Sequence, residues 1–155
     1  MIAVAAALVM LLMATPANAF GAFNPTLYRE TLISQINYYR THHHLAPLVW
    51  NADLQRAASA HSTNMAQHHV LSHTSASGVS WSTRIRWYGF RGSWIGENLA
   101  VGLFKPYHMF EMWVASPPHR ANLLCSHFRS AGIGVVQGTW AGHRAIYVTV
   151  DFGGP

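Results

Sequence analysis

The sequence predicts an α+β fold, on the evidence of two different apolar patterns along the chain. Segments whose apolar residues recur every three or four positions come first, and an alternating apolar pattern comes last. The two patterns do not alternate as they would in a doubly wound sheet of βαβ units. We therefore expect helices packed on a small antiparallel sheet, within a single domain over residues 20–155.

The first predicted helix begins at Asn24-Pro25, because an asparagine side chain caps free N–H groups and proline suits the first helical turn. Its expected apolar face consists of Leu27, Leu32, Ile33, Ile36 and Tyr39. A second helix is capped by Asn51 and runs to about His69. Its inner face combines small and apolar residues, namely Leu54, Ala57, Ala58, His61 and Met65.

A third helix begins at Pro106, carries Met109, Phe110 and Trp113, and is interrupted by Pro117-Pro118. The chain then changes period. The alternating residues are Ile133, Val135, Ile146, Val148, Val150 and Phe152. They predict a β-hairpin with one face on a core and a turn over residues 138–142.

The N-terminus predicts export through a signal peptide over residues 1–19. Residues 1–13 are almost wholly apolar, and Ala17-Asn18-Ala19 provides the small residues that a signal peptidase recognises, so the mature chain would begin at Phe20. The alternative is a membrane anchor, but the apolar run is shorter than the roughly 20 residues that span a bilayer. We expect a secreted, extracellular protein with no transmembrane segment in the mature chain.

The net charge indicates which classes of partner the chain can bind, and the cysteine content indicates which cross-links it can form. A formal charge of +5 favours anionic partners such as envelope polymers or acidic lipids. The chain has no basic run and no nucleic-acid motif, so nucleic acid is not an expected partner. The single cysteine, Cys125, cannot form an internal disulfide and is either a buried apolar residue or a thiol able to pair between chains. We expect a monomer held together by packing.

Four short motifs carry the sequence's most specific signal. They are Ser72-His73-Thr74, Gly96-Glu97-Asn98, Trp113 followed by Ser116-Pro117-Pro118-His119-Arg120, and Gly132-Ile133-Gly134. In order and spacing this series resembles the CAP superfamily of cysteine-rich secretory, antigen 5 and pathogenesis-related proteins, in its bacterial form, the SCP domain. The resemblance extends from about Leu27 to Phe152 and implies a three-layer α-β-α sandwich.

The resemblance also implies a central cleft lined by His73, Glu97 and His119, where some members bind a divalent metal. Two imidazoles and one carboxylate suit zinc or another divalent cation and leave one position for water. The alternative is a hydrogen-bonded cluster in which Glu97 orients an imidazole and Asn98 fixes a loop. Many eukaryotic members of the family have a second glutamate three residues after the helix tryptophan, where this chain has Ser116.

Other candidates for the cleft are ambiguous. Ser116 lies beside His119, and this pair suggests a hydrolase. A Ser-Pro sequence is, however, also common where a helix is interrupted. Arg120 and Asn122 either hold the cleft wall or meet an anionic ligand. His69 and His73 would form a second ligand pair only if the second helix continued past His69.

Three functions follow, and no catalytic residue is assigned. The favoured one is a non-enzymatic binding or interaction module of the cell envelope or extracellular space, with an anionic polymer, a lipid or an extracellular protein as its partner. The second is a lipid- or sterol-binding protein that uses an aromatic surface made by Trp81, Trp87, Tyr88, Phe90 and Trp94. The third is a metal-dependent hydrolase with Glu97 as base and His73 and His119 as ligands.

Overall fold

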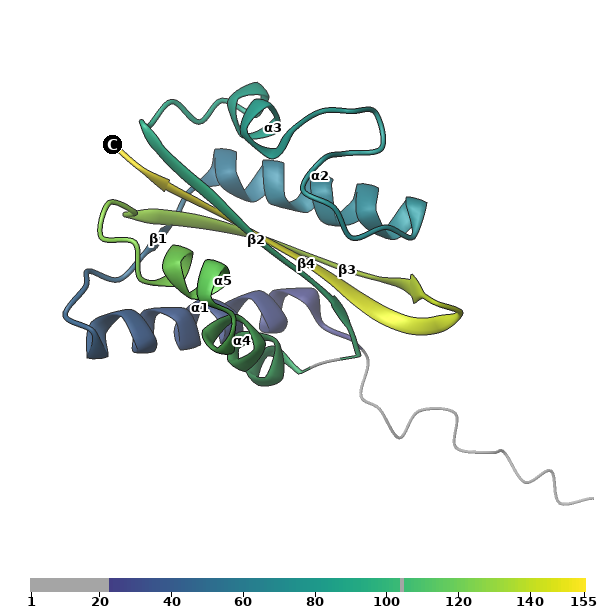
Figure 1. The fold of residues 1–155 in the computed structure, drawn as a ribbon, viewed down its shortest axis with the longest axis horizontal. Coiled ribbons are helices and arrows are strands. Elements are labelled where there is room, and N and C mark those ends of the chain that lie inside the picture. Colours follow the sequence, from purple (N-terminus) through teal and green to yellow (C-terminus); the bar gives the residue numbers. More distant parts are fainter. Residues whose placement is uncertain (1–22, 104) are drawn as a thin grey trace, which may run out of the picture.

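A computed structural model describes residues 23–103 and 105–155 (Figure 1). The predicted signal peptide, 1–19, lies outside these residues and stays a prediction. Within them the chain forms five helices and four strands. The helices are α1 Pro25–His42, α2 Ala52–His68, α3 Trp81–Trp87, α4 Pro106–Ala115 and α5 Pro117–Leu123. The strands are β1 Val49–Trp50, β2 Trp94–Gly102, β3 Ser130–Trp140 and β4 His143–Gly154.

The four strands form one mixed sheet in the order β1-β3-β4-β2. Strand β3 pairs antiparallel with β4, and β4 pairs antiparallel with β2. The short strand β1 pairs in parallel with Ser130 and Ala131 of β3. Helices α2 and α3 cover one face of the sheet, and α1, α4 and α5 cover the other (Figure 1). The predicted α+β, three-layer α-β-α architecture is confirmed.

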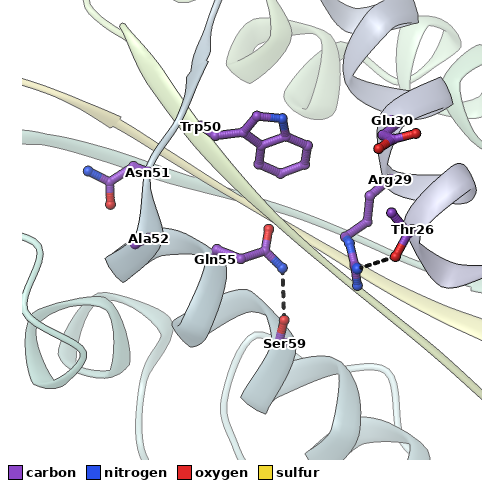
Figure 2. Close-up of a pocket in the computed structure, with 8 residues that line it drawn as sticks. All are labelled: Thr26, Arg29, Glu30, Trp50, Asn51, Ala52, Gln55 and Ser59. Atoms are coloured by element: carbon purple, nitrogen blue, oxygen red, sulfur yellow. Dashed lines mark hydrogen bonds between the residues drawn. The ribbon is translucent and has the colours of Figure 1, made fainter.

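Helix α2 lies close against β3 because glycines face it. A Cβ atom on Gly132 would lie 2.1 Å from the backbone N of Gln55, and one on Gly134 would lie 2.1 Å from the carbonyl oxygen of Ala58. The predicted inner face of α2 is confirmed, since Leu54, Ala57, Ala58, His61 and Met65 are all buried. This contact places Gln55, which is drawn in Figure 2, beside Ile133, whose N–H and C=O both bond its side-chain amide.

The opposite layer contains the larger hydrophobic core. Leu32, Ile33 and Ile36 of α1 are buried there, together with Trp113 of α4 and the alternating apolar residues of β3 and β4. The predicted position of Leu27 on this face is wrong. Its side chain is 59% exposed because the buried face of α1 carries Tyr28, Leu32 and Ile36 at a spacing of four residues, and Leu27 lies outside that face.

Two further expectations need correction. The hairpin turn is tighter than residues 138–142, because Trp140 still pairs with His143 and only Ala141 and Gly142 lie between the strands. Strands are also not confined to the C-terminus, since β1 and β2 lie between helices. Strand β2 was missed because its Gly96-Glu97-Asn98 segment does not show an alternating apolar pattern.

In the part of the chain that the structure describes, no helix is both long and apolar enough to cross a membrane.

Candidate functional site

Two of the predicted cleft residues, His73 and Glu97, lie together at the edge of the sheet formed by β2. A cavity of about 340 Å³ there is lined by His73, Trp81, Ile95, Gly96, Glu97 and Asn122. His73 comes from the loop between α2 and α3, Glu97 from β2 and Asn122 from α5. Three segments that are distant in the sequence therefore meet at this cavity.

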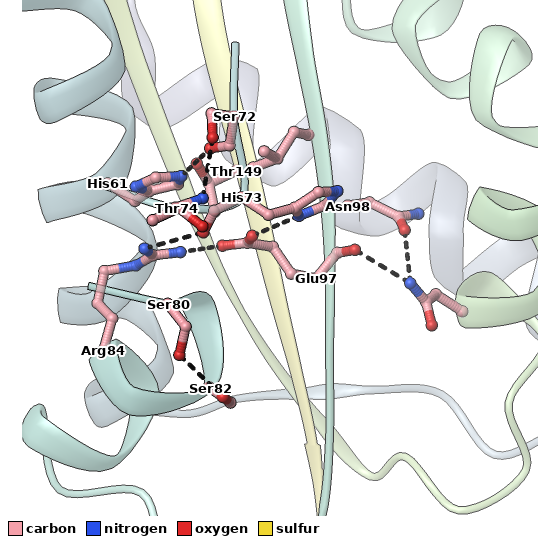
Figure 3. Close-up of polar contacts among 12 residues, drawn as sticks. His61, Ser72, His73, Thr74, Ser80, Ser82, Arg84, Glu97, Asn98 and Thr149 are labelled. Carbon is pink, nitrogen blue, oxygen red and sulfur yellow. Dashed lines mark hydrogen bonds and ion pairs between the residues drawn. The ribbon is translucent and has the colours of Figure 1, made fainter. Parts of the chain in front are cut away.

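Glu97 is the centre of a polar network, and both of its carboxylate oxygens are bound (Figure 3). The Nδ1–H of His73 donates to Oε1 at 2.7 Å, and the guanidinium of Arg84 binds Oε2. Glu97 is only 5% exposed and Arg84 only 4%. Arg84 and Glu97 therefore form a buried ion pair. Removing one partner would strongly destabilise the protein, because the other charge would stay buried without compensation.

Arg84 was not predicted from the sequence as part of the cleft. Ser80 caps the N-terminus of α3 through a bond to the Thr83 N–H, and this places Arg84 one turn into the helix, facing β2. Its Nη1 also donates to the hydroxyl of Ser75 at 3.2 Å. No sequence signal identified it, because Arg84 lies in no motif and meets Glu97 only through tertiary packing.

Asp151 was also missed, and it lies directly opposite Glu97 in the β2–β4 pairing. It is fully buried, and no donor in the described chain reaches either of its oxygens. Burial, reinforced by the charge of Glu97 and partly offset by Arg84, raises the pKa of Asp151 well above its ordinary range. A neutral acid at Asp151 can donate its proton to the carboxylate of Glu97. The sequence could have indicated this buried acid, because Asp151 stands between the apolar residues Val150 and Phe152 of a predicted strand.

His61 connects helix α2 to the loop that carries His73. Its Nε2–H donates to the carbonyl oxygen of Ser72 at 2.7 Å, whereas Nδ1 is buried without a partner in the described chain. Burial, with a smaller effect from the positive charge of Arg84, lowers the pKa of His61. His61 is therefore a neutral core residue that fixes the loop. The pair of His69 and His73 does not form, because α2 ends at His68 and His69 adopts a left-handed conformation.

The remaining predicted residues belong to the α4–α5 side of this edge. The hydroxyl of Ser116 and Nδ1 of His119 lie 2.7 Å apart. Burial, followed by the proximity of His73, lowers the pKa of His119. In the described residues no hydrogen bond joins His119 to His73 or Glu97. Arg120 is exposed and donates to the carbonyl oxygen of Val114 at 3.3 Å.

Asparagines and a tryptophan close the β2 edge. Asn122 Nδ2 donates to the carbonyl oxygen of Glu97 at 3.0 Å and to Oδ1 of Asn98 at 2.8 Å. Asn98 Nδ2 donates to the carbonyl oxygen of His119 at 3.0 Å, as expected for a residue that fixes a loop. Further along the strand, the indole N–H of Trp113 donates to the carbonyl oxygen of Leu99. Side chains of α4 and α5 thus take the place of a fifth strand.

These contacts do not fit a cation bound directly by His73, Glu97 and His119. Both oxygens of Glu97 are occupied, one of them by a guanidinium whose positive charge opposes a nearby cation. Among the residues that the structure describes, no group of three or more His, Cys, Asp or Glu side chains is arranged to hold a metal ion. We therefore derive no chemical step through a metal.

The profile of the cysteine-rich secretory protein family, CAP, matches residues 33–152. The chain belongs to the CAP family. This match includes every cleft residue considered above and agrees with the resemblance in the motifs. No curated protein sequence is significantly similar to the chain.

Solved CAP structures have the same fold. An extracellular protein with an SCP domain from Bacillus anthracis superposes with a TM-score of 0.69 at 24% identity, over 87% of this chain and 45% of that one. An outer surface protein from Borrelia burgdorferi gives 0.73 at 22% identity, over 85% and 96%. A cysteine-rich secretory protein from Staphylococcus aureus gives 0.67 at 18%, over 86% and 40%. This chain thus spans less than half of the Bacillus and Staphylococcus chains.

Proposed function

We propose that this CAP domain is a non-enzymatic interaction module of the extracellular space or the cell envelope. The observation that carries the proposal is the occupancy of Glu97. Its carboxylate holds His73 and Arg84 together and is not free to act as a base or as a direct metal ligand. A buried, fully bonded carboxylate at the centre of the predicted cleft favours a structural role.

The hydrolase alternative has less support. Ser116 and His119 are within hydrogen-bonding distance, but they are neighbours on one helical turn, and no carboxylate in the described chain orients His119. Nucleophilic catalysis by such a pair needs a base that is itself oriented by a third group. Glu97 cannot fill this role while His73 and Arg84 hold it.

The lipid alternative also has less support. The aromatic segment is divided, since Phe90 is buried in the core whereas Trp87 is 71% and Trp94 47% exposed. The cavity beside Glu97 has apolar walls at Trp81 and Ile95, but the polar side chains of His73, Glu97 and Asn122 also line it, and their desolvation opposes the burial of an acyl chain there. Packing in the core explains Phe90, and Trp87 and Trp94 are exposed side chains that need no bound acyl chain to explain them.

The proposed location, in the extracellular space or the cell envelope, rests on two arguments. The sequence predicts a signal peptide over 1–19, and the three solved relatives are described as extracellular, outer surface and secretory proteins. The formal charge of +5 favours an anionic envelope polymer, an acidic lipid surface or an acidic extracellular protein as the partner. We propose that the free protein is a monomer.

Thermal unfolding with and without a chelator and Zn²⁺ tests this proposal. Removing metal should leave the melting temperature of the wild type unchanged, and Glu97→Gln should lower the free energy of unfolding by about 3 kcal/mol because Arg84 loses its counter-charge. Glu111→Gln, the same change on the exposed face of α4, is the matched control and should stay within about 0.5 kcal/mol. A melting temperature that falls with chelator and recovers with Zn²⁺ would contradict the proposal.

A further inference from the structure

The other edge of the sheet, formed by β3, is largely unpaired. Strand β1 pairs with β3 only at Ser130 and Ala131, after which the chain turns away at Asn51 to begin α2. The opposite edge of β3 is paired with β4 along its whole length. From Gly132 onward, no strand of the described chain covers the outer edge of β3.

Hydrogen bonds identify which backbone groups point outward from this edge. The carbonyl oxygen of Ala131 accepts from Asn51, and both the N–H and the C=O of Ile133 bond to the side chain of Gln55. Because alternate residues of a strand direct their N–H and C=O to the same side, Val135 and Gln137 present theirs on this edge too. No group in the described chain bonds them there.

Gln55 occupies the edge as a peptide group would. Its Oε1 accepts from Ile133 N–H at 3.0 Å, and its Nε2 donates to Ile133 C=O at 2.8 Å. The next residue along the edge on α2 is Ser59, whose backbone N would lie 2.7 Å from a Cβ on Gly134. Residues Asn51, Gln55 and Ser59 therefore follow β3 step by step.

A cavity of about 640 Å³ lies between α1 and α2 beside this edge (Figure 2). It is lined by Thr26, Arg29, Glu30, Trp50, Asn51, Ala52, Gln55 and Ser59. Helix α1 forms one wall and α2 the other, with β3 passing between them (Figure 2). Trp50, at the end of β1, is 47% exposed and offers an apolar surface for a side chain of an added strand.

Residues 130–140 contain no charged side chain and no proline, which are the usual features that protect an edge strand from pairing. The two charged residues of the cavity, Arg29 and Glu30, have opposite signs and select no net charge. The features that the edge presents for recognition are consequently backbone groups in extended spacing and one aromatic surface.

We propose that the open edge of β3 binds an extended, uncharged polypeptide segment of a partner protein, which adds to the sheet beside Val135 and Gln137. Strand addition of this kind obtains affinity from main-chain hydrogen bonds and specificity from alternate side-chain pockets. The inference rests on the proposed interaction role and takes the extracellular protein as the partner, with an uncharged segment of that protein docking at an edge remote from Glu97.

Selection of random linear peptides displayed on phage, with the purified protein as bait, tests the inference. Selected peptides should bind the wild type and Gln137→Ala equally, because alanine keeps the backbone N–H. Gln137→Pro removes that donor and should weaken binding about tenfold, equivalent to about 1.4 kcal/mol. If Gln137→Pro does not fold, NMR hydrogen exchange on the wild type replaces it, with the Val135 and Gln137 amides becoming protected when peptide is added.

Two outcomes would overturn the inference. One is that no peptide is enriched, or that enriched peptides bind without protecting those amides. The other is concentration-dependent self-association of the wild type, lost in Gln137→Pro, which would assign the edge to a second copy of the chain. Either result leaves the proposed function intact, because that proposal is decided by the chelator and Glu97→Gln measurements.

Discussion

At the β2 edge, side chains from two helices bond the middle of the strand, whereas at the β3 edge only Gln55 does so and His69 reaches the strand near its end. Asn122 and Trp113 bond the outward carbonyl groups of Glu97 and Leu99, and buried charges lie behind them. Of the outward groups of β3, Gln55 bonds only those of Ile133, and those of Val135 and Gln137 have no partner in the described chain. The outward carbonyl of Thr139, near the end of the strand, accepts from the hydroxyl of Tyr147 and lies 3.1 Å from Nδ1 of His69. The comparison indicates that the region richest in chemically suggestive residues is the closed one.

The largest expected loss of stability comes from removing a positive charge at the β2 edge, and the same change at the β3 edge should cost little. Arg84→Met should lower the free energy of unfolding by about 3–5 kcal/mol, because Glu97 would stay buried without its counter-charge. Arg29→Met, at the β3 edge, should change it by no more than about 0.5 kcal/mol, because its partner Thr26 is exposed. Denaturant unfolding of both variants measures the difference. Equal losses would mean that the β2 edge is not held by a buried ion pair.

The next largest loss of stability is expected from removing the side-chain amides that bond the two edges, Asn122 at β2 and Gln55 at β3. Asn122→Ala should cost about 2 kcal/mol, since it leaves the Glu97 carbonyl and Asn98 Oδ1 without their donor. Gln55→Ala should cost about 1 kcal/mol, because the neighbouring cavity lets water replace the lost amide. Urea unfolding of the two variants gives the order, and the reverse order would remove the distinction between a closed and an open edge.

Asp151→Asn tests the buried acid behind the β2 edge. The folded-state pKa of Asp151 is raised, so its contribution to stability is fully present below the unfolded pKa of about 3.9 and is lost as pH rises toward the folded value. An asparagine amide can donate to Glu97 as the neutral acid can, but it does not ionise. Relative to the wild type, the variant should therefore gain stability as pH is raised from about 4 to 7. A difference independent of pH would show that Asp151 is ionised in both states.

This difference between variant and wild type is needed because His61 acts in the opposite direction. Its folded-state pKa is lowered, so its contribution to stability is present above the unfolded pKa of about 6.5 and is lost as pH falls. The His61 contribution cancels when Asp151→Asn and the wild type are compared at each pH.

The smallest effect is expected at Cys125, in the loop between α5 and β3. Its side chain is partly buried against the core, and Arg40 bonds its backbone carbonyl rather than its sulfur. Cys125→Ser should change the free energy of unfolding by about 1 kcal/mol or less, and reductant should not alter the wild-type melting temperature. A large loss under reductant would indicate a disulfide between chains.

The sequence predicted most of the fold because local signals decided it. Asn24 and Asn51 cap α1 and α2 as expected, and the alternating residues of β3 and β4 form the hairpin. Strand β2 and its partners were not predictable from periodicity. Glu97 and Asn98 are buried polar residues on a strand, and their burial is possible only because Arg84 and Asn122, from separate helices, bond them.

The candidate site was predicted in part for the same reason. The family motifs identified His73, Glu97 and Asn98, and the structure places them at one edge. Arg84 and Asp151 lie in no motif and meet Glu97 only through tertiary packing and strand register. The open edge of β3 could not be predicted from the sequence, because it depends on how early β1 leaves the sheet.

Hydrogen exchange followed by NMR on the wild-type protein tests the difference between the two edges most directly. The indole N–H of Trp113 and the amide of Ile133 should exchange slowly, because each donates to a protein oxygen. The amides of Val135 and Gln137 should exchange much faster, since nothing in the described chain accepts from them. Val135 and Gln137 amides as protected as that of Ile133 would contradict the account and show that the β3 edge is already closed.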